Sequence, residues 1–556
     1  MSKTKILLIL ILFLAFLLRF YKLGEVPNGL YQDETAIGYN AFSILQTGKD
    51  EYGKSFPLYF KSFGDWKLPV YIYSTLIPVK FFGLNEFSVR LSSALAGFLT
   101  VVLFYFYLKL ISKDEKLSLI STALLAINPW HLHYSRATFE VSLCLLFFIS
   151  GALLLHLFFE KGRKFCFLPA TILFILALYS YNLTRLLSPV LFLLFLLYYR
   201  KKLNEVSLLN LILTTITGVL LLIPFILTLL SGGGVSSAGG TLFFSSNAVW
   251  APLLEFRSYL VNLPSFFTSL FFNRVFLNLW QYLNNVASYF SVNFFFISGS
   301  AHGNHGIGNL GQFYLFELPL IILGIIKLGL EIREGKRWPK IFFFWAAVTI
   351  LVASLTRESP QATRSFFMVL PVEVISGVGL IYVWTNFRKS LILLIPLIIF
   401  NLVFYFNSYY YRFPIYYAKA WRVGDRDVSL YLKENESKYE KVIFDTPAGF
   451  IYTSLLFYLP FSSEEFQRTV MREPDDTEGF SVVKSFGKYQ FKEVDWRKDY
   501  YKDKKTLIIT TSDRKPDDVP PLKTFYYPRR PVVFSVKEKI MQYPIEEIAY
   551  VLVETP

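Results

Sequence analysis

The stretch ILLILILFLAFLLRFYKLG, from Ile6 to Gly24, decides the class of the protein. It is a nearly unbroken apolar run that follows Lys3 and Lys5. About 20 such residues let a helix cross the ~30 Å hydrocarbon core of a bilayer. A cleaved signal peptide would end in small residues, whereas this run ends with Arg19 and Lys22. We therefore expect an uncleaved first membrane span.

The rest of the chain has the composition of a membrane protein. Of its 556 residues, 54% are hydrophobic and only 17% are charged, too few charges for an ordinary soluble protein. The sequence therefore predicts a polytopic α-helical membrane protein with about eleven transmembrane helices. We place these spans near 6–23, 88–111, 117–132, 141–159, 166–182, 185–199, 208–230, 313–331, 341–356, 366–384 and 390–407.

Basic residues in alternate connections indicate how the chain is oriented. They include Lys113 and Lys116, the run from Arg200 to Lys202, and the pair Arg388 and Lys389. Connections rich in Lys and Arg face the cytoplasm. The net charge of +15 then reflects cytoplasmic loops and anionic lipid, and no basic soluble module points to nucleic acid. We expect a multi-pass protein of the cell membrane with a cytoplasmic N-terminus and an external C-terminal segment.

Two domains follow from this topology. The first, residues 1–407, is the transmembrane domain, with external loops at 24–87 and 231–312. The second, residues 408–556, is a small soluble external α/β domain. Its strand-like runs are VIFDT (442–446), TLIIT (506–510) and IAYVLVE (548–554), and a helix is predicted over 448–459.

Two adjacent acids open a short helix in the first external loop. Asp33 and Glu34 precede an apolar stripe formed by Ile37, Ala41 and Ile44, which predicts an amphipathic helix on the membrane surface. Asp33 either caps this helix, by accepting from its free N–H groups, or acts as a general base. The two roles stay open together.

A second charged pair follows in the same loop. Asp65 and Lys67 precede Pro69 and another aromatic-rich helix too broken to span. Lys67 either neutralises a phosphate at the interface or simply extends its ammonium to water.

These stretches resemble the first external loop of the C-type membrane glycosyltransferases of family 39. That family includes protein O-mannosyltransferases and lipid A aminoarabinose transferases. Its acidic pair is matched by Asp33-Glu34, and its Lys-Pro-Pro by Lys67-Leu68-Pro69, where Leu68 departs from the usual proline. Its start of the second span is matched by GLNEFSVRLSSALAG, from Gly83 to Gly97, the most specific of the three motifs.

Weaker matches follow in the family's order and cover most of residues 1–400. NPWHLHYSRATFE (128–140) supplies Arg136 and Glu140, and SYNLTRLLSP (180–189) supplies Arg185. The remaining two stretches are GSAHGNHGIGNLGQFYLFELP (299–319), with His302 and His305, and SPQATRSFFMVLP (359–371), with Arg364.

The resemblance implies transfer of a sugar from a polyprenyl-phosphate donor to a glycan, lipid or protein acceptor on the external face. Asp33 is then the general base of an inverting displacement, and Glu34 is its catalytic neighbour. The phosphate leaves as an anion, so the two-carboxylate scheme of a glycosidase is not needed. The implied substrate-binding residues are Asp65, Lys67, Arg136, Glu140, Arg185, Arg364, His302 and His305.

Two alternatives stay open for these site residues. Each helix-end arginine either forks onto phosphate oxygens or extends to the interface without a ligand. No cofactor follows from the motifs, but the spacing of His302 and His305, with Glu34, leaves a divalent metal site open.

A polytopic transporter or flippase of a lipid-linked or small solute is the competing function. It predicts ionisable residues in mid-span and pseudo-symmetric halves. We find almost no mid-span charge and no internal repeat, and a scaffold protein would not need the external acids and arginines. The glycosyltransferase interpretation is therefore favoured.

Overall fold

The structure is a computed structural model that describes residues 2–230, 272–446, 450–475, 481–501, 505–536 and 539–555, with a few isolated residues between 242 and 270. The chain forms two compact units. One, the helical unit, comprises Met1–Phe20, Ser93–Ser135 and Phe139–Tyr405. The other, the mixed unit, comprises Tyr21–Ser92, Arg136–Thr138 and Phe406–Pro556.

Each of the eleven predicted apolar segments contains a helix. Within the described residues, five helical stretches are long and apolar enough to cross a membrane, so the structure supports several spans without fixing their number. The helices are α1 (Lys3–Phe20), α4 (Glu86–Ser112), α5 (Glu115–Ile127), α7 (Glu140–Lys161), α8 (Phe167–Leu178), α9 (Thr184–Tyr198), α10 (Leu208–Leu230), α15 (Glu317–Arg333), α16 (Trp338–Ala353), α18 (Val369–Asn386) and α19 (Leu391–Asn407).

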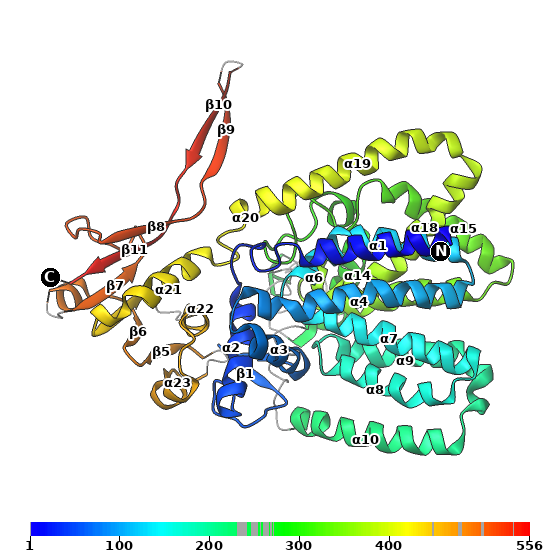
Figure 1. The fold of residues 1–556 in the computed structure, drawn as a ribbon, viewed down its shortest axis with the longest axis horizontal. Coiled ribbons are helices and arrows are strands. Elements are labelled where there is room, and N and C mark those ends of the chain that lie inside the picture. Colours follow the sequence, from blue (N-terminus) through cyan, green and yellow to red (C-terminus); the bar gives the residue numbers. More distant parts are fainter. Residues whose placement is uncertain are drawn as a thin grey trace. The chain divides into compact units, whose positions relative to one another are not determined.

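The helical unit is built from closely packed helices. In Figure 1, α7, α8 and α9 lie side by side, and α10 contacts α8. The tightest crossing joins α15 to α18. A Cβ added at Gly324 of α15 would collide with the Ile375 carbonyl of α18, and one at Gly379 with the Leu320 carbonyl of α15. Small residues let membrane helices approach this closely, so the two glycines hold this crossing.

Shorter helices connect these elements or flank the sheet. In the helical unit they are α6 (Pro129–Arg136, whose last residue falls in the mixed unit), α14 (Arg274–Ser288) and α17 (Ala362–Ser365). In the mixed unit they are α2 (Gln32–Thr47), α3 (Pro69–Phe82), α20 (Phe413–Tyr416), α21 (Val423–Asn435), α22 (Tyr452–Tyr458) and α23 (Ser463–Thr469).

A seven-stranded mixed sheet forms the centre of the mixed unit. Its order is β4-β5-β6-β3-β7-β11-β8, and β3 is parallel to both of its neighbours. The three predicted strand runs are confirmed as β3, β7 and β11, and the predicted helix as α22. The strands are β3 (Lys441–Asp445), β4 (Met471–Arg472), β5 (Val483–Phe486), β6 (Tyr489–Lys492), β7 (Thr506–Thr510), β8 (Lys523–Tyr526) and β11 (Ile548–Glu554).

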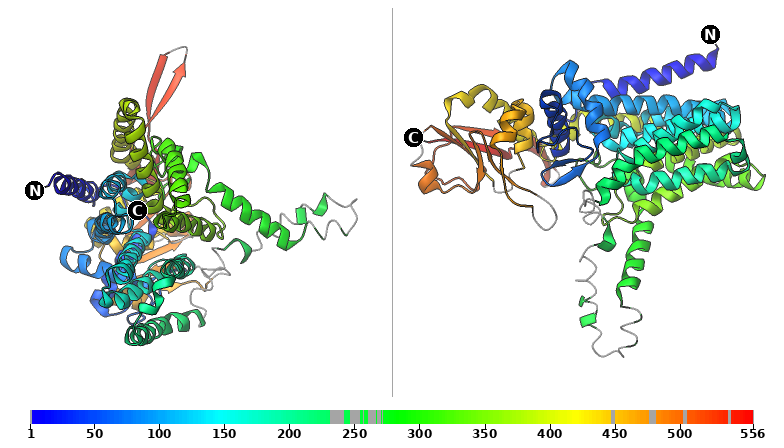
Figure 2. Two further views of the ribbon diagram at one scale, coloured as in Figure 1. Left: turned by 90° about the vertical axis from the view of Figure 1, so that its right-hand side faces the viewer. Right: turned by 90° about the horizontal axis from the view of Figure 1, so that it is seen from below.

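Alternating side chains of the central strands build a core on each face of the sheet. Val442 and Phe444 of β3 pack into one cluster with α22, whereas Ile443, between them, packs into a second cluster with Ile508. This is the period of two that a strand buried on both faces requires. Two further strands, β9 (Arg530–Val536) and β10 (Lys539–Ile545), form a hairpin that extends away from this sheet (Figures 1 and 2).

The predicted surface helix of the first loop is α2, and the structure buries it. Ile37, Ala41 and Ile44 are buried as expected, but so are most residues of the opposite face. A Cβ at Gly38 would collide with Phe457 of α22. The expectation of a helix lying on the membrane was therefore wrong, because α22, far along the chain, covers the face assigned to solvent.

A buried polar cluster joins α2 to the C-terminal segment. Both oxygens of the Glu51 carboxylate accept hydrogen bonds, one from Asn40 and Ser62 at 3.2 Å each and the other from the Tyr452 hydroxyl at 2.8 Å. Burial raises the pKa of Glu51 to about 7, although the charge of Arg472 opposes the shift. The first loop and the C-terminal domain thus share one core.

Candidate functional site

Asp33 lies in the first turn of α2 and forms an ion pair with Lys67. Its Oδ1 is 2.7 Å from the Lys67 Nζ. Lys67 ends strand β2 (Asp65–Lys67), which pairs with β1 (Phe60–Ser62), and this hairpin directs the lysine to the helix. The Asp33 carboxylate is 41% exposed, whereas the Lys67 side chain is only 4% exposed. A buried cation therefore holds an accessible carboxylate.

The capping role considered for Asp33 is not found. The helix begins at Gln32, its N-cap residue is Tyr31, and no side chain caps it. Asp33 comes after the N-cap position and directs its carboxylate to Lys67 instead. The interpretation as a cap was therefore wrong, because the helix starts two residues earlier than a cap at Asp33 requires.

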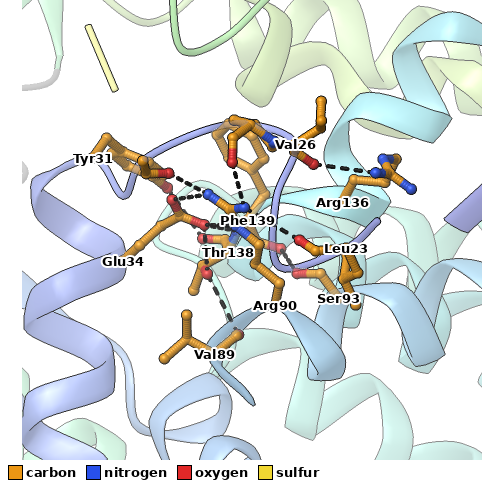
Figure 3. Close-up of polar contacts among 12 residues, drawn as sticks. Leu23, Val26, Tyr31, Glu34, Val89, Arg90, Ser93, Arg136, Thr138 and Phe139 are labelled. Atoms are coloured by element: carbon orange, nitrogen blue, oxygen red, sulfur yellow. Dashed lines mark hydrogen bonds and ion pairs between the residues drawn. The ribbon is translucent and has the colours of Figure 1, made fainter. Parts of the chain in front are cut away.

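Glu34, the neighbouring acid, faces the opposite environment (Figure 3). It is fully buried, and its Oε1 accepts from the Arg90 Nε at 3.1 Å and from the Thr138 amide and hydroxyl at 2.9 Å each. Its Oε2 accepts from Arg90 at 3.2 Å. A carboxylate so fully bonded holds other groups in place, which makes Glu34 a positioning residue by geometry.

Arg90 and Arg136 both hold the segment that follows the first span (Figure 3). Arg90 donates to the Leu23 and Pro27 carbonyls at 3.2 and 2.8 Å, and also to that of Gly29. Arg136 donates to the Lys22 and Val26 carbonyls at 3.2 and 3.1 Å.

The Arg136 guanidinium does not extend to the interface. It is fully buried, and its Nε donates to the Tyr409 hydroxyl at 3.2 Å. The prediction that Arg136 binds substrate gains no support from these contacts, since the described ones fix the backbone of the loop.

Asp65 is described only through its backbone. It pairs with Ser62 across the β1–β2 hairpin. Its side chain lies outside the described residues, so its predicted substrate-binding role stays a prediction.

A second charged cluster lies in the helical unit, around Glu358. The Arg364 guanidinium is 3.8 Å from one Glu358 oxygen, and the His302 Nε2 is 3.7 Å from the other. His302 and Glu358 are more than half exposed, whereas Arg364 is 16% exposed. Arg364 follows Gln361, whose side chain caps the short helix α17. These contacts are long, and His302 and Glu358 stay accessible to a ligand.

His305 lies beside this cluster but has a different environment. Its Nδ1 is 2.9 Å from the Thr363 hydroxyl, which also contacts the Tyr134 hydroxyl at 2.8 Å. Burial, with the nearby charges of His302 and Arg364, lowers the pKa of His305 to about 3. His305 is therefore a neutral imidazole at physiological pH.

The two remaining predicted residues lie at helix N-termini of the helical unit. Glu140 is the first residue of α7, where the helix dipole favours a carboxylate. Arg185 lies in the first turn of α9, with its guanidinium 5.2 Å from the centre of the Phe225 ring. Both side chains are half-buried, and their substrate-binding roles stay predictions.

The metal hypothesis is not supported by the described residues. Among them, no three His, Cys, Asp or Glu side chains come together in a group that could hold a metal ion. Glu34, considered as a ligand with His302 and His305, is instead bonded to Arg90 and Thr138.

The sequence hypotheses missed Arg90, Thr138 and Glu358. Arg90 is the arginine of the Gly83–Gly97 motif, but nothing in the sequence indicated that it pairs with Glu34. The Thr138–Glu34 and Glu358–His302 contacts join residues far apart in the chain, so no local pattern predicts them.

Comparison with known proteins found one family match, over part of the chain. Residues 67–229 match the dolichyl-phosphate-mannose-protein mannosyltransferase family. No curated protein matches the sequence.

The fold is similar to that of ArnT from Cupriavidus metallidurans. The apo structure of ArnT shares 13% identity and a TM-score of 0.53, over 99% of this chain and 98% of ArnT. The structure of ArnT bound to undecaprenyl phosphate gives the same values. At this identity the likeness shows the fold, which is that of a membrane protein. The predicted resemblance to C-type glycosyltransferases is thereby supported, since residues 67–229 match a mannosyltransferase family and the chain has the fold of ArnT.

Proposed function

We propose that the protein transfers a sugar from a polyprenyl-phosphate donor to an acceptor on the external face of the membrane, with Asp33 as general base. The observation that carries this proposal is the Asp33–Lys67 pair. It holds an accessible carboxylate at the start of a buried helix, only 2.7 Å from a buried cation.

The proposed reaction is a direct displacement at the anomeric carbon. The acceptor hydroxyl or amine gives its proton to Asp33 as its oxygen or nitrogen bonds to that carbon. The bond between the sugar and the phosphate breaks, and the lipid phosphate leaves as an anion. This requires no second acid and inverts the configuration of the sugar.

A polyprenyl-phosphate donor is supported by the relatives. ArnT has been seen bound to undecaprenyl phosphate, and the matched family is described by a dolichyl-phosphate donor. We propose that Arg364 and Arg185 bind the donor phosphate, because neither residue is fully buried and arginine forks onto phosphate oxygens. Glu34 and Arg136 are proposed to position the loop that carries Asp33.

The proposed topology has eleven spans, a cytoplasmic N-terminus, and Asp33 and residues 408–556 outside. Its support is the correspondence of eleven helices with the predicted segments, and the basic residues on one set of loops. In this arrangement residues 1–407 form the transmembrane domain. Residues 408–556 form an external domain that shares its core with the first external loop.

The substitution Asp33→Asn tests the catalytic role. Membranes that contain the protein are supplied with radiolabelled mannosyl- and glucosyl-phosphate polyprenols, and labelled product is counted. We expect transfer to fall by about 10²- to 10⁴-fold, the usual contribution of a general base. The thermal midpoint should fall as well, since Lys67 is only 4% exposed and loses its anionic partner, so transfer is expressed per amount of folded protein.

A matched control shows whether transfer is lost because Asp33 is removed or because any ion-paired carboxylate of this unit is removed. Asp427→Asn removes another half-exposed carboxylate that is ion-paired, to Arg426 at 2.9 Å in the same unit, and should leave transfer unchanged. Transfer by Asp33→Asn at the wild-type rate would exclude Asp33 as the base. Solute transport without any glycosidic product would instead favour a transporter.

A further inference from the structure

A cavity of about 320 Å³ lies in the helical unit, and no residue proposed for catalysis lines it. It is formed where one set of helix ends comes together. Asp114 precedes α5, Lys327 and Glu331 belong to the last turns of α15, Lys336 and Trp338 lead into α16, and Tyr382 is near the end of α18. This volume is at the lower end of the range of small-ligand sites.

The ionisable groups of the cavity are unevenly paired. Lys336 and Glu331 form an ion pair at 3.1 Å, and each neutralises the other. The Asp114 Oδ1 accepts from the Leu117 amide at 3.0 Å and so caps α5. Lys327 is half-buried in the apolar helix α15, and within the described part of the chain it has no ion pair or hydrogen bond.

A half-buried lysine on a membrane helix is unfavourable without an anionic partner. Lys327 has no such partner among the described residues, and an anionic ligand in the cavity would supply one. A simple anion would meet the Asp114 carboxylate across the same cavity, and Lys327 and Asp114 do not pair with each other in the structure. A ligand with both a phosphate and a primary amine satisfies both groups, with the phosphate against Lys327 and the amine against Asp114.

The surroundings fit the headgroup region of a bilayer. Trp338 and Tyr382 line the cavity, and Lys116 places its ammonium 5.1 Å from the Trp384 ring. Trp and Tyr are enriched where a membrane helix meets the polar headgroups. The neighbouring connections carry the lysines that assign this side to the cytoplasm, and anionic headgroups bind such basic pockets between helices.

We propose that this cavity binds the phosphoethanolamine headgroup of an aminophospholipid in the cytoplasmic leaflet. The site is distinct from the external residues proposed for sugar transfer and does not depend on that function. Its occupant bridges the ends of α5, α15, α16 and α18, and so stabilises the helical unit.

The experiment measures lipid retention by the purified full-length protein. The protein is reconstituted in nanodiscs of phosphatidylcholine that contain equal small fractions of phosphatidylethanolamine and phosphatidylglycerol, and retained lipids are counted by native mass spectrometry. We expect phosphatidylethanolamine to be retained preferentially and to raise the thermal midpoint. Lys327→Gln should weaken its retention by about tenfold, the effect of losing one hydrogen bond from a charged group.

Two further variants make the test specific. Asp114→Asn keeps a side-chain oxygen that caps α5 but removes the negative charge, so the preference for phosphatidylethanolamine over phosphatidylglycerol should fall while the midpoint in pure phosphatidylcholine is kept. Lys340→Gln removes an exposed lysine of α16 that does not line the cavity, and should retain lipids as the wild type does.

Each outcome decides the proposal. Equal retention of both lipids, or unchanged retention by Lys327→Gln, overturns the site. If a variant shows a lowered midpoint in pure phosphatidylcholine, only the ratio of retained phosphatidylethanolamine to phosphatidylglycerol is used, because misfolding lowers the retention of both lipids. Stabilisation by soluble O-phosphoethanolamine without preference among lipids would overturn the lipid source and identify a soluble aminophosphate ligand.

Discussion

Two groups of charged side chains in this protein are built in opposite ways. In the mixed unit, Glu34 and Arg90 are both fully buried, 3.1 Å apart, and bonded to backbone on several sides. In the helical unit, Glu358 and His302 are each more than half exposed and 3.7 Å apart. The first group has exchanged all of its water for protein partners, and the second has kept most of it.

The difference separates groups that shape a site from groups that a ligand can reach. A buried ion pair with filled hydrogen bonds fixes geometry, and loss of one partner leaves an uncompensated charge. An exposed pair at nearly 4 Å adds little to stability. Asp33 combines both features, since its own carboxylate is exposed and its partner Lys67 is buried.

The largest stability effect is expected from Arg90→Met. It removes the cation beside Glu34 and should lower the free energy of unfolding by about 3–5 kcal/mol, because the Glu34 charge stays buried without its partner. Thermal unfolding of the detergent-purified protein measures the loss.

The double variant Glu34→Gln/Arg90→Met is the control for this effect. It removes both charges and should recover part of the lost stability. If Arg90→Met alone unfolds at the wild-type temperature, the buried pair does not hold the first loop.

A smaller effect on stability is expected from the titration of Glu51, another buried acid of the mixed unit. Its folded pKa of about 7 lies above the ordinary value of 4.5, so its contribution to stability is full below pH 4.5 and is lost as the pH rises to 7. The loss amounts to about 3 kcal/mol. Unfolding of the wild type and of Glu51→Gln is compared from pH 4.5 to 8.5.

The measured quantity is the difference in the free energy of unfolding between the wild type and Glu51→Gln. The wild type should lose stability relative to Glu51→Gln across that interval, because glutamine cannot titrate. A constant difference over the whole range would show that Glu51 is already ionised in the folded protein at low pH.

The smallest effect is expected from Glu358→Gln in the exposed group. Its contacts with Arg364 and His302 are long and Glu358 is more than half exposed, so the free energy of unfolding should change by less than about 1 kcal/mol. A loss above 2 kcal/mol, measured in the same thermal assay, would show that the Glu358 cluster stabilises the fold as the Glu34–Arg90 pair does. The two groups would then not differ in kind.

The sequence predicted the helices well because apolar length is a local signal. Every predicted apolar segment contains a helix, and VIFDT, TLIIT and IAYVLVE are strands of one sheet. The strands β5 and β6 were not predicted, since each is only four residues long.

The partners of the site residues were much harder to predict. Lys67 was expected to neutralise a phosphate or to extend to water, but it contacts Asp33 and is buried. The burial of α2 depends on α22, which no local pattern reveals. Such pairings are set by packing between distant segments, and a periodicity within one segment carries no information about them.

One mid-span acid also escaped the sequence interpretation. Glu373 is fully buried near the middle of the apolar stretch Ala362–Asn386, with its Oε1 2.7 Å from the Asn128 amide nitrogen. The expectation of almost no ionisable residue in mid-span was wrong at this position. Glu373 is compatible with the membrane because it has a polar partner there.

The buried network of the first loop has a consequence for the order in which the protein folds. Glu34 lies 56 residues before Arg90 and 104 before Thr138, and Glu51 lies 401 residues before Tyr452. A ribosome that adds about 5–20 residues per second needs on the order of 20–80 s to cover the last interval. The first external loop is thus among the earliest parts made and among the last to reach its final state. Until α22 has been synthesised, Asp33 is carried by a helix whose outer face is still exposed, so the first loop reaches its final packing only after most of the chain has been made.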